Sequence, residues 1–176
     1  MTIIFEAHSS TKDNEAHLSS GHNDVELSPQ GVQQAKELGE RYKNDSFDAI
    51  FCSDLQRSYK TAEIAFNGRF PIIKDKRLRE CDYGDLTSHP SDEVEPQKVN
   101  HIIEPFPNGE SYEDCMKRIK DFLDELRQNV HDRKQNVMII GHRATQYGLE
   151  HLINGKSLKE LITTPFIWQP GWSYKW

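Results

Sequence analysis

The sequence has few cysteines, no long apolar run and no excess of positive charge, and each shortage excludes a class of protein. The three cysteines, Cys52, Cys81 and Cys115, are odd in number and form no CxxC pair. A disulfide framework or a zinc site is therefore not indicated. No apolar run approaches the ~18 residues of a membrane span, and the N-terminus lacks the features of a signal peptide. We expect a cytoplasmic protein with no membrane partner.

The balance of charge disfavours a nucleic-acid partner. The 176 residues carry a formal net charge of −6, with a pI near 5.7, whereas nucleic-acid binding usually requires a basic face. A pocket for a small phosphorylated molecule needs only a few local cations. The length and the hydrophobic fraction of 35% suit one compact domain that spans residues 1–176.

Two short apolar segments, each followed by a histidine, give the strongest signal in the chain. Residues 2–7 lead to His8, and residues 137–141 lead to His142. Short runs rich in β-branched residues are typical of buried strands in a parallel sheet, and ligands of such sheets bind beyond the carboxyl ends of the strands. Either histidine alone is more often a structural residue. Together they predict an active site at one edge of the sheet.

Helical and strand-like patterns alternate along the chain, which predicts an α/β fold, a three-layer α/β/α sandwich with a mostly parallel central sheet. Ser28 and Pro29 form a typical helix start, and apolar residues follow them at helical spacing. We expect helices at 29–43, after Ser53 or Asp54, after Ser111 and from about 144 to 154, and further strands at 47–51 and 70–73.

Three segments lack a regular period. The polar loop 9–26 is expected to lie over the end of the first strand, since long loops in compact domains are usually functional. Residues 75–108 form an irregular excursion. The tail, 166–176, contains all three tryptophans but also a Pro-Gly pair, so we expect an extended segment packed on the body. A homodimer contact through this tail remains open.

Arg57 is expected at the same edge of the sheet as the histidines, because its helix begins where a strand ends. A cation in the first turn of a helix opposes the helix dipole, so its side chain either has a role elsewhere or forms a surface ion pair. Arginine matches phosphate with two parallel hydrogen bonds, and imidazole can attack phosphorus. The three side chains therefore suit a phosphoryl group.

Five motifs occur in a consistent order. They are His8 with Asn14, Ser20-Gly21 and Asp24; residues 27–31; residues 53–58 with Thr61-Ala62; residues 78–84 around Glu80; and Gly109-Glu110-Ser111 with Gly141-His142. With these motifs the chain resembles the histidine phosphatase superfamily, in its phosphoglycerate-mutase-like branch, over nearly its whole length. Each motif alone is weak, whereas the ordered series is specific.

The resemblance implies a role for each matching residue. His8 would be the nucleophile and form a phosphohistidine, and Glu80 would protonate the leaving alcohol and then activate water. Arg57 and His142 would hold the transferring oxygens. The residues expected to bind the substrate are Asn14, Ser20 and Gly21. No metal and no other cofactor is implied.

One departure from the family pattern concerns charge. The family has an arginine directly before its nucleophilic histidine, where this chain has Ala7, and a glycine directly after it, where this chain has Ser9. Losing a charged phosphate donor costs on the order of 2 to 4 kcal/mol of transition-state stabilisation, about 30-fold to 1000-fold in rate. Arg143 is the first candidate to replace it at the substrate, and Lys12 and His22 are weaker ones.

We therefore expect a metal-independent phosphatase that hydrolyses a small phosphomonoester through a phosphohistidine on His8. A phosphoglycerate-type mutase is an alternative, although the excursion after Glu80 offers little material for a lid. A non-catalytic phosphate-binding protein that lost its activity with the arginine is another. A metal-dependent hydrolase that uses the two histidines and nearby aspartates is also open.

Overall fold

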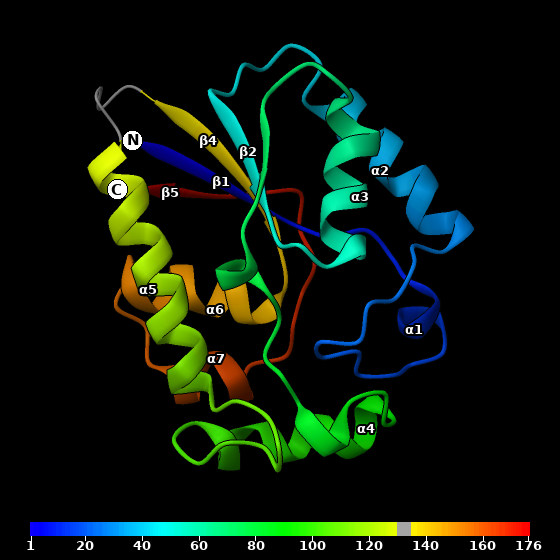
Figure 1. Cartoon of the computed structure of the whole chain (residues 1–176), viewed down its shortest axis with the longest axis vertical. Helices are drawn as coiled ribbons and strands as arrows, with labels where there is room; N and C mark the ends of the chain where they lie inside the picture. Colours follow the sequence, from blue (N-terminus) through cyan, green and yellow to red (C-terminus); the bar gives the residue numbers. More distant parts are fainter. Residues whose placement is uncertain (130–134) are drawn as a thin grey trace.

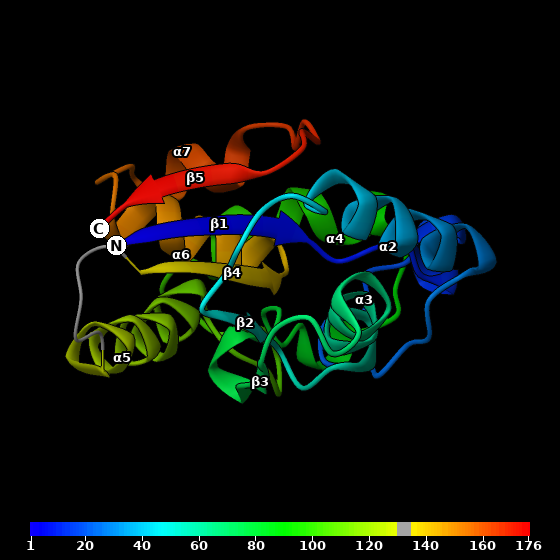
Figure 2. The same ribbon diagram turned by 90° about the horizontal axis from the view of Figure 1, so that it is seen from above.

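The computed structural model describes residues 1–129 and 135–176, and its strands form a five-stranded sheet with the order β3-β2-β4-β1-β5. Figure 2 shows the strands side by side in this order. The strands are β1 (Thr2–Ala7), β2 (Ala49–Cys52), β3 (Ile72–Lys74), β4 (Asn136–Gly141) and β5 (Trp172–Lys175). All neighbouring strands are parallel except β5, which pairs antiparallel with β1. The predicted mostly parallel sheet is confirmed.

Seven α-helices and three short 3-10 helices accompany these strands in the described ranges. They are α1 (Lys12–Glu15), α2 (Pro29–Arg41), α3 (Gln56–Phe66), η1 (Lys76–Leu78), η2 (Gly84–Leu86), α4 (Ser91–Val94), η3 (Glu95–His101), α5 (Tyr112–Asn129), α6 (Arg143–Leu152) and α7 (Leu158–Thr163). Within residues 1–129 and 135–176, none of these helices combines the length and apolar character that a membrane crossing requires.

The sheet separates two hydrophobic clusters, and this separation produces the three layers. On one face, α2 and α3 pack their apolar stripes against β2 and β4, with Ala62 and Phe66 fully buried. On the other face, α5, α6 and α7 cover β1 and β4, with Ile119 and Leu123 at the centre. Figure 1 shows the two groups of helices on opposite sides of the strands. Burial of these apolar surfaces is the main stabilising contribution to such a core.

Several element boundaries differ by a few residues from the predicted ones. The Ser28 hydroxyl accepts the backbone N–H of Gly31 (3.0 Å) and caps α2 as expected. The helix ends at Arg41 rather than at residue 43. Strand β2 starts at residue 49 instead of 47, because Phe47 packs into the core before the ladder begins. The loop 9–26 contains the single-turn helix α1, which hydrophobic periodicity could not reveal.

The tail contains more regular structure than predicted. Residues 172–175 form β5 on the free edge of β1, where the ring of Trp172 contacts Phe5 at 5.6 Å between centroids. The N-terminal amine of Met1 donates to the carbonyl of Trp176 (2.9 Å), so both termini lie together (Figures 1 and 2). Residues 164–171 lead to this strand without regular structure and expose Ile167 and Trp168. The homodimer contact stays a prediction.

Candidate active site

The two strand–histidine segments are neighbours in the sheet. β1 and β4 pair in register, with Ala7 opposite Gly141. The ladder continues for one more bond, from the backbone N–H of His8 to the carbonyl of Gly141 (3.0 Å). The imidazole rings of His8 and His142 consequently lie 5.0 Å apart between centroids. The predicted juxtaposition of the two histidines at one sheet edge is present in the structure.

The ring of His8 is held in the tautomer that a nucleophile needs. Its Nδ1 lies 2.8 Å from the carbonyl oxygen of Ser9, which can only accept a hydrogen bond, so Nδ1 carries the proton. The lone pair is then on Nε2. Burial, and secondly the charge of Arg57, lower the pKa of His8 to about 3. Both effects disfavour a second proton on the ring and keep the lone pair available.

Arg57 is almost completely buried in the first turn of α3. Its guanidinium donates to the carbonyls of Gly21 (2.7 Å) and Asn23 (2.8 Å) in the first loop. Thr61, one turn further, accepts the backbone N–H of Ser9 (3.0 Å) and donates to the carbonyl of Arg57 (2.7 Å). This threonine therefore ties the segment that follows His8 to the helix that carries Arg57.

His142 is the N-cap residue of α6 and is 2% exposed. Its Nε2 lies 2.7 Å from the hydroxyl of Ser53, while its Nδ1 is buried without a partner among the described residues. Burial, followed by the charge of Arg57, lowers the pKa of His142 well below its ordinary value. The ring is therefore neutral. The hydroxyl of Ser53 can donate to Nε2 or accept from it, and when it donates, the proton of the ring lies on Nδ1 as a free donor.

The prediction that Ser53 or Asp54 caps α3 is wrong. The N-cap residue is Leu55, which makes no side-chain cap bond. The hydroxyl of Ser53 contacts His142, and the carboxylate of Asp54 forms two bonds of 2.6 Å to the guanidinium of Arg79. Both polar side chains thus serve tertiary contacts at the site rather than the start of the helix.

Glu80 lies at the N-terminus of α6, directly beside His142. Its carboxylate accepts the backbone N–H groups of Arg143 (3.2 Å) and Ala144 (3.1 Å), as well as that of Cys81 (2.8 Å). Helix N-termini stabilise anions through such free N–H groups. The three bonds fix the orientation of the carboxylate toward the cavity that it lines.

Arg118 on α5 holds the segment that carries Glu80. Its guanidinium donates to the carbonyls of Arg77 (2.7 Å), Arg79 (2.8 Å) and Glu80 (2.8 Å), and to both carboxylate oxygens of Glu110 (2.9 Å each). One half-buried cation therefore satisfies the backbone acceptors on both sides of the predicted acid. No local pattern indicates this role, because Arg118 is one of many charged residues on an amphipathic helix.

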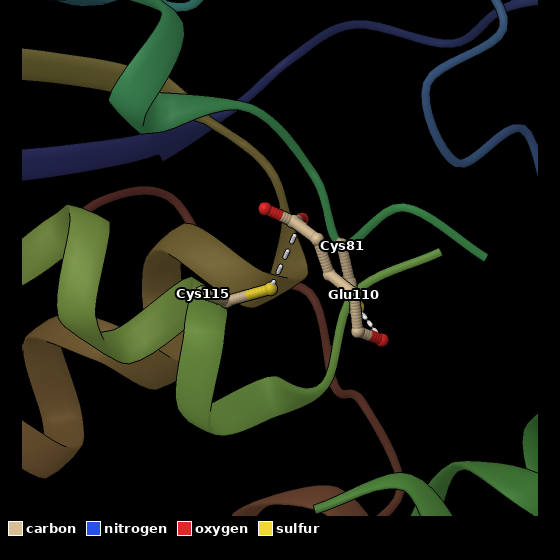
Figure 3. A group of neighbouring side chains, drawn as sticks. All are labelled: Cys81, Glu110 and Cys115. Carbon is tan, nitrogen blue, oxygen red and sulfur yellow. Dashed lines mark hydrogen bonds between the residues drawn. The ribbon is translucent and has the colours of Figure 1, made fainter. Parts of the chain in front are cut away.

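The guanidinium of Arg118 also contacts a cluster of three potential metal ligands. Cys81, Glu110 and Cys115 place one ligand atom each within 4.8 Å of one another, and Figure 3 shows them converging between α5 and the Glu80 segment. Arg118 donates to the sulfur of Cys115 at 3.3 Å. Hydrogen bonding with Cys115 and burial raise the pKa of the Cys81 thiol. The cation in this cluster is therefore the arginine side chain.

All eight residues predicted for the site line a single cavity of about 310 Å³, which we name the main cavity: His8, Asn14, Ser20, Gly21, Arg57, Glu80, His142 and Arg143. Asn14 accepts the N–H and hydroxyl of Thr11 through its carbonyl oxygen (3.0 and 2.9 Å), which leaves its amide group to donate. The hydroxyl of Ser20 donates to the carboxylate of Asp13 (2.9 Å), and the carbonyl of Gly21 accepts a hydrogen bond from Arg57.

Two further cations, Arg143 and Lys98, line the main cavity. Arg143 is in contact with Glu95 at 3.6 Å, and its Nε is buried without a partner in the described chain. Lys98, on η3, is 2% exposed and also pairs with Glu95 (2.5 Å). Sequence reasoning missed Lys98 because nothing in the polar excursion marks one lysine as buried. Neither Lys12 nor His22, the weaker candidates, lines the main cavity.

The start of α2 packs directly on the segment after His8. A Cβ at Gly31 would lie 1.9 Å from the carbonyl oxygen of Ser10, so only glycine fits there. The N–H of Ser28 donates to the same carbonyl (3.0 Å). The glycine in the motif at residues 27–31 thus has a structural reason, since it lets the helix pack against the segment that follows His8.

The chain is similar to known proteins over most of its length. Residues 3–166 match the model of the histidine phosphatase superfamily, branch 1. Phosphoserine phosphatase 1 of Hydrogenobacter thermophilus is 31% identical, covering 80% of this chain and 70% of its own. A 2,3-bisphosphoglycerate-dependent phosphoglycerate mutase of Bartonella quintana is 29% identical, covering 92% and 85%. The solved structure of Bacillus stearothermophilus YhfR superposes with a TM-score of 0.82 at 28% identity, covering 96% and 87%.

Proposed function

The chain belongs to the histidine phosphatase superfamily, and we propose that it hydrolyses a small phosphomonoester through a phosphohistidine on His8. Relatives named as phosphatases support a phosphoric monoester hydrolase. The observation that carries the proposal is the state of His8. Its Nδ1 is engaged by the Ser9 carbonyl, so the free Nε2 lone pair is the nucleophile in a cavity that also holds Arg57 and Glu80.

In the first step, Nε2 of His8 attacks phosphorus opposite the leaving oxygen, forming the P–N bond as the P–O bond breaks. Glu80 gives its proton to the departing alkoxide, which leaves as the alcohol. In the second step the Glu80 carboxylate takes a proton from water, and the hydroxide attacks phosphorus. The P–N bond breaks, inorganic phosphate leaves and His8 regains its neutral form.

The charge that develops on the phosphoryl oxygens is met by fixed donors of the chain. Arg57 is held by two carbonyls, and the free Nδ1–H of His142 is oriented through Ser53, so neither must reorganise during the reaction. We propose that Arg143 supplies part of the positive charge that, in other members of the family, comes from the arginine directly before the nucleophilic histidine. These cations allow the reaction to proceed without a metal ion.

The substrate we propose carries a second anionic group on its leaving alcohol. Lys98 and Arg143 share the single carboxylate of Glu95, which leaves one positive charge uncompensated in that part of the main cavity. Phosphoserine and phosphoglycerate, the compounds named for two relatives, are both phosphomonoesters with a carboxylate. A carboxylate near Lys98 would place the ester oxygen toward Glu80.

Phosphate release from a panel of phosphomonoesters tests the proposal, with EDTA present and with p-nitrophenyl phosphate in the panel. Wild-type protein is expected to release phosphate, and His8→Ala to release none while unfolding at a similar temperature. Release that survives in His8→Ala, or that needs added metal, would contradict it. No release from any substrate by folded wild type would favour a non-catalytic phosphate-binding protein.

A mutase is the second candidate, supported by the similarity to a phosphoglycerate mutase. A mutase must keep its phosphohistidine away from water until the phosphoryl group returns to the substrate. Here the lining of the main cavity includes Trp168, which is 56% exposed, and Phe166, which is 37% exposed. Side chains this exposed do not shield the site from water. Hydrolysis therefore ranks first. Isomerisation of a phosphoglycerate faster than phosphate release would reverse that order.

A further inference from the structure

A second cavity of about 430 Å³ adjoins the main cavity, and we name it the side cavity. It lies between β1, α2 and the tail, and the residues found only in it include Glu6, Gln34, Glu37 and Arg41. Four residues line both cavities: Ala7, His8, Ser10 and Trp168. His8 therefore lies where the two linings meet, which we name the junction.

Ala7 is the small residue at this junction, in the position where the family pattern has an arginine. A methyl group takes up little of the space where the two linings meet, whereas a longer side chain at residue 7 would take up more. The Glu6 carboxylate beside it is occupied, since it accepts Arg41 (2.9 Å) and the hydroxyl of Tyr42 (2.7 Å). The change at residue 7 therefore removes a charge at a residue that lines both cavities.

The side cavity suits an uncharged or cationic group with a flat ring. Arg41 neutralises Glu6, and Glu37 pairs with no cation among the described residues, so the charge of the lining is negative overall. The indole of Trp168 forms a wall, with the Arg41 guanidinium 5.6 Å from its centroid. A second phosphate would be repelled here, whereas an aryl group can stack on the indole.

We propose that this protein also hydrolyses phosphodiesters, binding the second ester arm in the side cavity. The inference rests on the proposed function, because the same His8 attacks phosphorus. The P–O bond to the leaving arm breaks and Glu80 protonates that oxygen. The intermediate is a His8 phosphoramidate that still carries the second arm. Water then cleaves the P–N bond and releases a phosphomonoester, with atoms and charges balanced as in the monoester reaction.

The charge of the site supports this substrate class. A phosphodiester carries one negative charge where a phosphomonoester dianion carries two, and its second ester oxygen needs no cation. Replacing the family arginine by Ala7 withdraws one cation and leaves a small side chain beside His8. The missing donor and the additional cavity thus have a common explanation.

The test compares p-nitrophenyl phosphate with bis(p-nitrophenyl) phosphate, whose second arm is an uncharged ring. Wild type is expected to turn over both. In Ala7→Arg, kcat/KM for the diester should fall about tenfold or more because the longer side chain takes up space at the junction, while kcat/KM for the monoester should rise about tenfold or more through the restored donor. Ala7→Leu is the matched variant, since it adds volume without charge. It should lower the ratio of diester to monoester kcat/KM without raising the monoester value. Trp168→Ala should weaken diester turnover more than monoester turnover.

Each remaining outcome has a definite meaning. Monoester hydrolysis without diester hydrolysis by wild type would overturn the inference and leave the proposed function intact. Equal diester rates in wild type, Ala7→Arg and Ala7→Leu would also overturn it, because the side cavity would then play no part. Diester hydrolysis that persists in His8→Ala would assign the activity to another site. Monoester turnover by each Ala7 variant shows in the same assay that the variant is folded.

Discussion

The ends of β1 and β4 have almost the same sequence pattern, yet their histidines have different surroundings. His8 engages a carbonyl through Nδ1 and has a free Nε2, and it lies at the junction of two cavities. His142 engages Ser53 through Nε2, caps α6 and is almost fully buried. We therefore propose that the hydrogen-bond partner, and not the strand pattern, decides which ring attacks and which ring holds the substrate.

This difference between the two histidines predicts unequal losses of activity when they are substituted, with the largest loss at His8. His8→Asn keeps a polar side chain but removes the nucleophile, so kcat should fall about 10⁴-fold or more. Steady-state phosphate release measures this loss. A residual activity within tenfold of wild type would show that His8 is not the attacking group.

His142→Asn should have a smaller effect than His8→Asn, because it removes one donor to the transition state while the nucleophile remains. The expected loss in kcat is about 10²-fold to 10³-fold. The phosphoenzyme should still form in this variant, only more slowly, as rapid-quench measurements would show. A loss equal to that of His8→Asn, with no phosphoenzyme, would remove the distinction between the two rings.

Arg118→Met should separate the positioning of Glu80 from the chemistry of the histidines. It removes the bonds to the carbonyls of Arg77, Arg79 and Glu80, so we expect a loss of about 1 to 3 kcal/mol in unfolding free energy. The fall in kcat should be larger for substrates with poor leaving groups, which need the Glu80 proton most. Equal effects on p-nitrophenyl and alkyl phosphates would indicate a purely structural role.

Ser53→Ala should produce a milder change, about tenfold in kcat, because the ring of His142 stays in place but loses the partner that selects its tautomer. The KM should change little, since Ser53 does not line the main cavity. Ser53→Thr retains a hydroxyl and is the matched control. A KM effect without a kcat effect would contradict this role.

The last prediction concerns stability in mild acid. The pKa of His8 and that of His142 are lowered by burial and by Arg57, so below the unfolded value of about 6.5 the unfolded chain binds protons that the native rings do not. The unfolding free energy should therefore fall from pH 7 to pH 5, by roughly 2 kcal/mol for each ring.

Urea titrations of wild type and His8→Asn at several pH values isolate the contribution of His8. Glu6 acts in the opposite direction, because burial raises its pKa and its stabilising effect is lost as pH rises. The variant keeps Glu6, so the difference between the two slopes reports His8 alone. Identical slopes would show that the His8 ring is protonated equally in both states.

The sheet, and the meeting of the site residues at one of its edges, could be predicted from the sequence for a geometric reason. Parallel strands meet at one edge, so residues after β1 and β4, together with the helix start after β2, had to converge there. The contacts of Ser53 and Arg118 could not be predicted, because their hydrogen-bond partners lie far away along the chain. Ser53 looked like a helix cap, and its hydroxyl instead bonds to a ring 89 residues away. Burial of Lys98 is a tertiary property, and no local pattern reports it.

The central claim is that His8 becomes phosphorylated, and trapping the intermediate tests it most directly. Wild type mixed with ³²P-labelled phosphomonoester and quenched within milliseconds in alkali should carry label on His8, stable in base and lost in acid. His8→Asn should carry none, and His142→Asn should still be labelled. Label on His142, or rapid turnover without any labelled protein, would contradict the assignment of His8 as the nucleophile.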